Sequence, residues 1–214
     1  MPAGAADPPA RPTAGLAPFF TRAGAAPRAP DGDGFLQRWL LLEPIVKPNR
    51  SNTGFTGAYV RQAFATRYFP GQFTAVPRDG ESAAASPPLR WHALDTDLFD
   101  VKLFNFAQGL GKPTYGVIFW AVTVVNSPRD IANVRLAVGS NSASMWWVNG
   151  KEAAALFGDR RMVMDDVVSP PLTLRKGRNV IRGAVINGPG LSDFCVRFID
   201  ANGQPVRTIS LVTH

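Results

Sequence analysis

Histidine sets the first limit on the chemistry open to this sequence, because it is the usual base beside a hydrolytic nucleophile. The chain has two histidines, His92 and the C-terminal His214. No Gly-x-Ser-x-Gly nucleophile elbow accompanies them, and the segment 80–84 imitates that motif only weakly. The sequence therefore predicts no catalytic residues. The alternative is a hydrolytic site built from loops around His92, whose simpler role is that of a polar neighbour of Trp91 at a strand edge.

Charged side chains within one connection form the next candidate site. Arg160 and Arg161 precede Asp165 and Asp166 within the segment 151–166. Such a group can exchange hydrogen bonds with a polar ligand, or its members can pair with one another and hold the loop rigid. We expect the first arrangement and leave the second open.

A second acidic group consists of Asp95, Asp97 and Asp100, with a spacing compatible with loop oxygens around a hard cation. It lacks the glycine and the terminal glutamate of an EF-hand, so ion pairs or turn positions are the simpler interpretation. A structural Ca²⁺ ion is left open here but has no support. The chain has too few cysteines and histidines for a transition-metal site, and no cofactor is predicted.

Two successive tryptophans carry the strongest indication of a binding surface. Trp146 and Trp147 lie in one predicted strand, whose period of two sends their indoles to opposite faces. We expect one indole in the core, and the other either covered by the segment 151–166 or accessible. An accessible indole beside amide and carboxylate groups suits a sugar, whose C–H face stacks on the ring. Asn149-Gly150 follows directly and predicts a tight hairpin turn.

Strands must position these residues. Residues 116–125 form a nearly continuous apolar run rich in β-branched residues, which is typical of a central strand covered on both faces. Short apolar segments with turn signals at 175–178 and at Asn202-Gly203 follow. The spacing at 58–68 predicts a short helix, and 101–106 resembles a strand. The expected fold class is all-β, a two-sheet antiparallel β-sandwich or jelly roll.

The N-terminal segment differs in character from the rest of the chain. Residues 1–30 contain 10 alanines and 7 prolines, with almost no spaced hydrophobic pattern. Such a segment buries too little apolar surface to offset the entropy of ordering it. We therefore expect residues 1–33 to be a disordered linker or leader, with Phe19 and Phe20 as the one place where it could dock, and residues 34–214 to be the sandwich domain.

Charge and cysteine content exclude some partners and leave the compartment open. The net charge is +7, but the basic residues are scattered and form no run, so nucleic acid is not an expected partner. A single cysteine, Cys195, forms no intramolecular disulfide, and its place in an alternating run predicts a buried, inert thiol. No apolar stretch is long enough to cross a bilayer, and the first residues lack the features of a signal peptide.

Two short motifs resemble a recurrent signature of galactose-binding-like sandwiches. In that signature a strand ends in W-x-N-G, here Trp147-Val148-Asn149-Gly150, and a later L-x-K-G-x-N turn, here 174–179, leads into the next strand. The residues at 119–123, 159–166 and 182–190 extend this resemblance. Together with the two motifs, they make the stretch 34–211 similar to modules found with bacterial acetylxylan esterases and other polysaccharide-degrading proteins.

This resemblance implies a secreted or periplasmic, non-catalytic carbohydrate-binding or accessory module of a xylan or acetylxylan-type degrading system. Its expected partners are a polysaccharide or oligosaccharide and a catalytic esterase or glycosidase domain. The alternative is a small carbohydrate esterase, acetylxylan esterase-like, with the loop-built site around His92; no position matches an esterase motif. The candidate ligand-binding residues are Trp91, His92, Trp146, Trp147, Asn149, Arg160, Arg161, Asp165 and Asp166.

Overall fold

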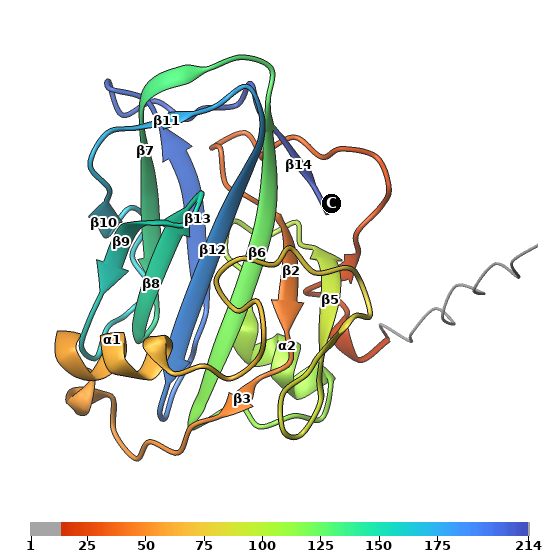
Figure 1. Ribbon diagram of the computed structural model, residues 1–214, viewed down its shortest axis with the longest axis vertical. Helices are drawn as coiled ribbons and strands as arrows, with labels where there is room; N and C mark the ends of the chain where they lie inside the picture. Colours follow the sequence, from red (N-terminus) through yellow and green to blue (C-terminus); the bar gives the residue numbers. More distant parts are fainter. Residues whose placement is uncertain (1–13, 214) are drawn as a thin grey trace, which may run out of the picture.

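The computed structural model describes residues 14–213 and shows two antiparallel β-sheets packed face to face (Figure 1). The larger sheet has ten strands in that range and the smaller has four. The prediction of an all-β, two-sheet antiparallel sandwich is therefore confirmed.

The larger sheet is built around two long neighbouring strands, β6 (Val117–Ser127) and β12 (Gly177–Asn187), which pair along their whole length. Its main path runs β1-β5-β2-β6-β12-β8-β9, while β3 and β14 pair with β6 and β4 pairs with β5. The remaining strands of this sheet are β1 (Thr21–Arg22), β2 (Arg38–Leu42), β3 (Ile45–Val46), β4 (Ser82–Ala83), β5 (Leu89–Asp95), β8 (Ala143–Val148), β9 (Lys151–Leu156) and β14 (Ser210–Val212).

The smaller sheet is centred on β7 (Ile131–Ser140), which pairs with β10 (Val167–Val168), β11 (Leu172–Leu174) and β13 (Phe194–Ile199). Three connections, β7 to β8, β11 to β12 and β13 to β14, pass from this sheet to the larger one. The turn at 175–178 is therefore a crossover between sheets and not the tip of a hairpin.

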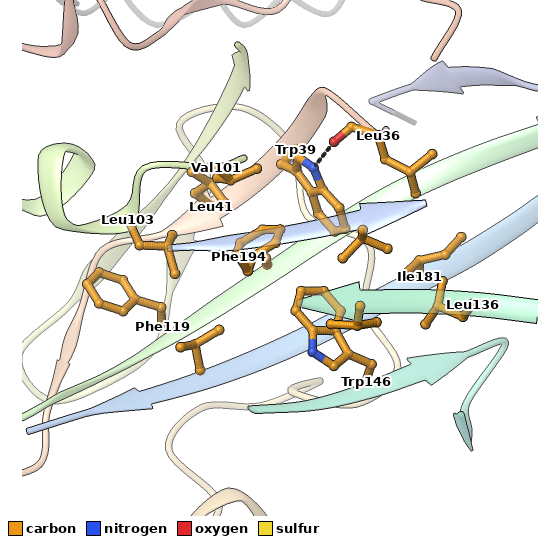
Figure 2. Close-up of a cluster of buried hydrophobic side chains, with 14 of the residues drawn as sticks. Leu36, Trp39, Leu41, Val101, Leu103, Phe119, Leu136, Trp146, Ile181 and Phe194 are labelled. Atoms are coloured by element: carbon orange, nitrogen blue, oxygen red, sulfur yellow. Dashed lines mark hydrogen bonds between the residues drawn. The ribbon is translucent and has the colours of Figure 1, made fainter. Parts of the chain in front are cut away.

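Alternation along the strands fills the space between the sheets with one core. The indoles of Trp39 and Trp146 meet edge to face, with ring centroids 5.9 Å apart, and Phe194 packs against both (Figure 2). Gly183 lies opposite Trp146 on β12 and is needed there, since a Cβ at Gly183 would lie 2.3 Å from the indole. This packing fixes the register of β8 against β12.

A second apolar layer covers the outer face of the larger sheet. It comes from α1 (Gly57–Ala65), capped by the Thr56 side chain, and from the covering loop, residues 66–81, which joins α1 to β4. In Figure 1 this yellow segment runs in front of β6 and β2 towards β5. Because both faces of the larger sheet are covered, β6 is buried almost throughout, as its continuous apolar run predicts.

The predicted strand at 101–106 is instead the start of α2 (Leu103–Gly109), in which Leu103, Phe106 and Ala107 share a buried helical face. The remaining helical elements are the 3₁₀ turns η1 (Ala14–Leu16) and η2 (Asn52–Gly54).

The expected leader 1–33 lies only partly within the described residues, because residues 1–13 fall outside them. From residue 14 onward the chain contacts the sandwich: Leu16 and Phe20 are buried in the inter-sheet core, and β1 pairs with β5. The folded unit therefore includes residues that the Ala/Pro composition assigned to the leader. Backbone hydrogen bonds to Ala93 and Leu211 and ion pairs of Arg28 hold this segment in addition to the two buried side chains.

Cys195 is buried, as predicted, and burial raises the pKa of its thiol to about 12. No helix among the described residues is both long and apolar enough to span a membrane.

Candidate functional site

The outer face of the larger sheet carries a pocket beneath the covering loop, with a cavity volume of about 180 Å³. We call it the outer-face pocket. Its rim is exposed and its floor is buried. Its lining residues are Phe69, Pro70, Gly71, Ala75, Pro77, Glu81, Ser82, Ala83, Ala84, Trp91 and Arg182.

Hydrogen bonds hold the covering loop in place over the sheet. The side chain of Gln72, itself buried, accepts from Tyr68 N and donates to Phe64 O and Thr66 O. At the other end of the loop, Trp91 N donates to Glu81 O at 2.9 Å. The pocket therefore has walls that are fixed before any ligand arrives, which limits the entropy lost on binding.

Arg182 is the most unusual group in the pocket. It lies on β12 directly between Trp147 of β8 and Val122 of β6, on the outer face of the sheet. The side chain is only 4% exposed, and its single hydrogen bond among the described residues runs from Nη2 to Ala75 O at 2.7 Å. A guanidinium has five N–H donors, so most of them have no protein acceptor among the described residues.

Aromatic rings continue from the pocket along the same face. Trp91 meets Phe69 edge to face, and Phe69 meets Trp120. Trp147 stacks on Trp120 at 5.9 Å with an interplanar angle of 15°, and Phe73 of the covering loop packs on both. Phe73 is 42% exposed and Trp147 is partly buried, so apolar ring surface is accessible beside the pocket.

The two tryptophans of β8 do face opposite sides of the sheet, as strand alternation predicts. Trp146 is fully buried between the sheets, where its Nε1 donates to Ser144 Oγ at 2.9 Å. Trp147 lies on the outer face beside Arg182. Trp146 is thus a core residue, and Trp147 is the ring of the pair that a ligand could reach.

The predicted ligand residues Arg160, Asp165 and Asp166 do not join Trp147. Glu152 of the same segment does lie opposite Trp147, on β9, but it pairs with Arg61 of α1. Arg160 pairs with Asp166, and Asp165 pairs with Arg197 on β13 of the smaller sheet. Val163 O approaches Gly139 of β7 so closely that a Cβ there would lie 1.9 Å away. Residues 160–166 therefore cover the outer face of the smaller sheet, on the opposite side of the sandwich, and the pair of Asp165 with Arg197 holds them there. Arg161 is exposed.

Asn149 has a structural role in the turn. Asn149 and Gly150 both have positive φ, 50° and 79°, and they connect the paired residues Val148 and Lys151 as a two-residue hairpin turn. The Asn149 side chain donates to Asn179 Oδ1 and accepts from Val180 N. Both ends of its amide are therefore engaged within the protein, which gives Asn149 a structural role in this turn.

His92 and Trp91 are neighbours on β5 and face opposite sides of the sheet. Trp91 lines the outer-face pocket, while His92 packs edge to face against Phe106. The Nε2 atom of His92 lies 3.3 Å from Glu43 Oε1, and Lys112 Nζ lies 3.2 Å from Glu43 Oε2. Burial raises the pKa of Glu43, but the hydrogen bonds to His92 and Lys112 outweigh it and lower that pKa to about 2.

The acidic group at 95–100 forms ion pairs. Arg38 donates two hydrogen bonds, of 2.8 and 2.9 Å, to the carboxylate of Asp95. Asp97 forms an ion pair with Arg28, and Asp100 forms one with Lys102. Within residues 14–213, no three His, Cys, Asp or Glu side chains are grouped so that they could hold a metal ion.

Sequence reasoning missed Arg182 and the covering loop. The signal for Arg182 was present, because it is the one charge in the apolar run 180–186 of a central strand. A charge at such a position is buried, and a buried charge requires a partner or a function. The covering loop has no comparable signal, because its residues become a pocket wall only after the loop folds over the sheet.

Comparisons with known proteins give only remote structural similarities. No protein-family model matches the chain, and no curated protein matches it. The PA14 sugar-binding domain from an RTX adhesin is similar, with a TM-score of 0.44 and 12% identity over 81% of this chain and 96% of that one. The PA14 domain of the MpAFP antifreeze protein gives a TM-score of 0.42 and 10% identity, covering 81% of this chain and 89% of that one. Neither similarity places the chain in a family.

Proposed function

We propose that the protein is a non-catalytic carbohydrate-binding module and that its sugar site is the outer-face pocket with the neighbouring rings of Phe73 and Trp147. The observation that carries the proposal is the buried guanidinium of Arg182, which lines a pocket walled by Trp91 and Phe69 and forms a single hydrogen bond among the described residues.

This combination matches the chemistry of a sugar. Each pyranose ring has an apolar C–H face that packs on an aromatic ring, and hydroxyl groups at its edge that require hydrogen-bonding partners. The pocket supplies the donors of Arg182 together with the polar side chains of Glu81 and Ser82 at its rim. Its volume of about 180 Å³ suits one small unit, with the next units lying over Phe73 and Trp147.

The esterase alternative gains no support from the geometry around His92. A hydrolytic histidine needs a nucleophile within hydrogen-bonding reach. The hydrogen-bond partner of His92 within residues 14–213 is Glu43, and both side chains are less than 10% exposed. A carboxylate beside a buried histidine orients the ring, but in the described part of the chain no hydroxyl or thiol is hydrogen-bonded to His92. We therefore propose binding without turnover.

Three further parts of the proposal follow from the sequence resemblance. We propose that the glycan is of the xylan type, that the module serves a polysaccharide-degrading system alongside a catalytic esterase or glycosidase domain, and that it acts in a secreted or periplasmic setting.

A glycan array, followed by calorimetric titration of the best ligands and an acetyl-ester turnover assay, tests the proposal. Saturable binding without turnover supports it. Turnover that is abolished by His92→Ala contradicts it in favour of the esterase alternative, and the absence of binding to every glycan contradicts it altogether.

A further inference from the structure

Arg182 is a buried cation that has no anionic partner among residues 14–213. Arg38 offers the matched comparison, because it is also 4% exposed and lies on a strand of the same sheet. Arg38 is held by the carboxylate of Asp95 through two hydrogen bonds, whereas Arg182 forms no ion pair among the described residues. The same sheet therefore contains two buried arginines. Arg38 is paired with a carboxylate, and Arg182 is not paired with one among the described residues.

The charge on Arg182 persists despite its burial. Desolvation lowers the pKa of the guanidinium to about 10, which leaves it protonated at neutral pH. A buried, unpaired charge costs stability, and such a cost is typical of a residue retained for binding.

Glu81 is the one carboxylate among the residues that line the pocket. It is exposed at the rim, and its Oε2 accepts from Arg78 N at 2.8 Å, so it is held away from an ion pair with Arg182. Beyond the rim, Asp79 is paired with Arg22 and accepts from Ala93 N. The floor of the pocket therefore carries the positive charge of Arg182. The negative charge among the lining residues is that of Glu81, which lies in solvent and is screened.

We infer that the outer-face pocket selects an acidic sugar, a uronic-acid residue whose carboxylate pairs with Arg182. This inference rests on the proposed function and names the ligand class of the same site. A guanidinium presents its donors as a planar fork that matches the two oxygens of a carboxylate, and a buried pair of this kind gains strength from the low dielectric. The sugar ring then lies against the pocket walls of Trp91 and Phe69.

The test uses pairs of ligands that differ only in the carboxylate. Glucuronate-bearing xylan fragments and galacturonan fragments are titrated beside the same fragments after chemical reduction of each carboxyl group to a primary alcohol. We expect reduction to weaken binding by about tenfold or more. Equal binding of both members of each pair overturns the inference but leaves the proposed function standing, while no binding of any glycan contradicts the proposed function itself.

Variants of the pocket connect the preference to Arg182. Arg182→Met should remove the preference for the acidic member, and Arg182→Lys, which keeps the charge without the fork, should keep only part of it. Glu81→Gln should widen the preference for the acidic member of each pair, because it removes a like charge at the rim. A preference that survives in Arg182→Met would place the acidic subsite elsewhere.

Thermal unfolding separates binding from structure. If Arg182 is retained for a ligand, Arg182→Met should unfold at the same temperature as the wild type or higher, and the acidic fragment should raise the melting temperature of the wild type only. A variant that melts far below the wild type would instead assign Arg182 a structural role. The comparison of ligand pairs on the wild type remains decisive in that case.

Discussion

The side-chain amide of Asn149 donates to Oδ1 of Asn179 at 2.9 Å and thereby joins the two motifs of the sequence signature. Asn179 is fully buried; its Oδ1 also accepts from Arg175 N, and its Nδ2 donates to Arg175 O and Gly177 O. One asparagine therefore ties the β8–β9 turn to the crossover that enters β12. The two asparagines of the signature therefore hold the sheet together.

Removing this link should destabilise the fold without a direct effect on ligand binding. Asn179→Ala leaves several buried backbone groups unpaired and should lower the free energy of unfolding by about 2–3 kcal/mol, and Asn149→Ala by about 1 kcal/mol. The control is Asn202→Ala, at an exposed turn, which should change the free energy of unfolding by less than about 0.5 kcal/mol. Urea unfolding measures all three. If Asn149→Ala is fully stable but no longer binds glycan, then Asn149 is a ligand-binding residue and its structural role is wrong.

The Asn149-Gly150 turn should tolerate no β-branched residue at its second position. Gly150 has φ of 79°, so Gly150→Val should cost about 1–3 kcal/mol through backbone strain. Gly32→Val is the matched control, because Gly32 is exposed, has open space around its Cβ position and does not have positive φ. Chemical denaturation of both variants gives the comparison, and equal costs would show that the strain argument is wrong.

The two tryptophans of β8 should respond differently to substitution. Trp146→Ala removes an indole from the centre of the inter-sheet core and should cost about 3–5 kcal/mol. Trp147→Ala removes a partly exposed ring and should leave a folded protein with weakened glycan binding. Circular dichroism and calorimetric titration separate these outcomes. Phe99→Ala is the binding control, because Phe99 is as exposed as Phe73 but packs on Phe35, away from the pocket. Unchanged affinity in a folded Trp147→Ala variant would exclude that ring from the site.

The Glu43 network predicts acid sensitivity. Burial raises the pKa of Glu43, but hydrogen bonds to His92 and Lys112 lower it from 4.5 to about 2. A carboxyl whose folded-state pKa is depressed stabilises the fold above its unfolded value, and that contribution is lost as the pH falls from about 4.5 through about 2. The contribution is up to about 3 kcal/mol. When urea unfolding is measured between neutral pH and about pH 2, the free energy of unfolding should fall less in Glu43→Gln than in the wild type. It should also fall less than in the exposed control Glu81→Gln. Identical profiles would remove Glu43 from the acid response.

The fold was largely predictable because its strongest signals are local. The continuous apolar run of β6, the alternation at Trp146 and Trp147 and the Asn149-Gly150 turn each constrain the backbone within a few residues. Strand partners were harder to predict, because successive strands such as β7 and β8 lie in different sheets and local periodicity does not report which sheet a strand joins.

The candidate site was predictable only in part. Trp91 and Trp147 belong to the proposed site, but the charged residues at 160–166 lie across the sandwich from them. Chain proximity suggested that this segment folds back over the outer face; instead, the close approach of Val163 to Gly139 draws it to the smaller sheet. The covering loop that does form the pocket begins some eighty residues earlier in the sequence, a distance no local pattern bridges.

The indole N–H resonances of the five tryptophans test the position of the site most directly. Trp39 and Trp146 lie between the sheets, whereas Trp91, Trp120 and Trp147 lie on the outer face. Titration of a binding glycan into ¹⁵N-labelled protein should shift the resonances of Trp91 and Trp147 in a saturable way and leave those of Trp39 and Trp146 in place. Saturable binding that leaves all three outer-face indoles unshifted would contradict the account.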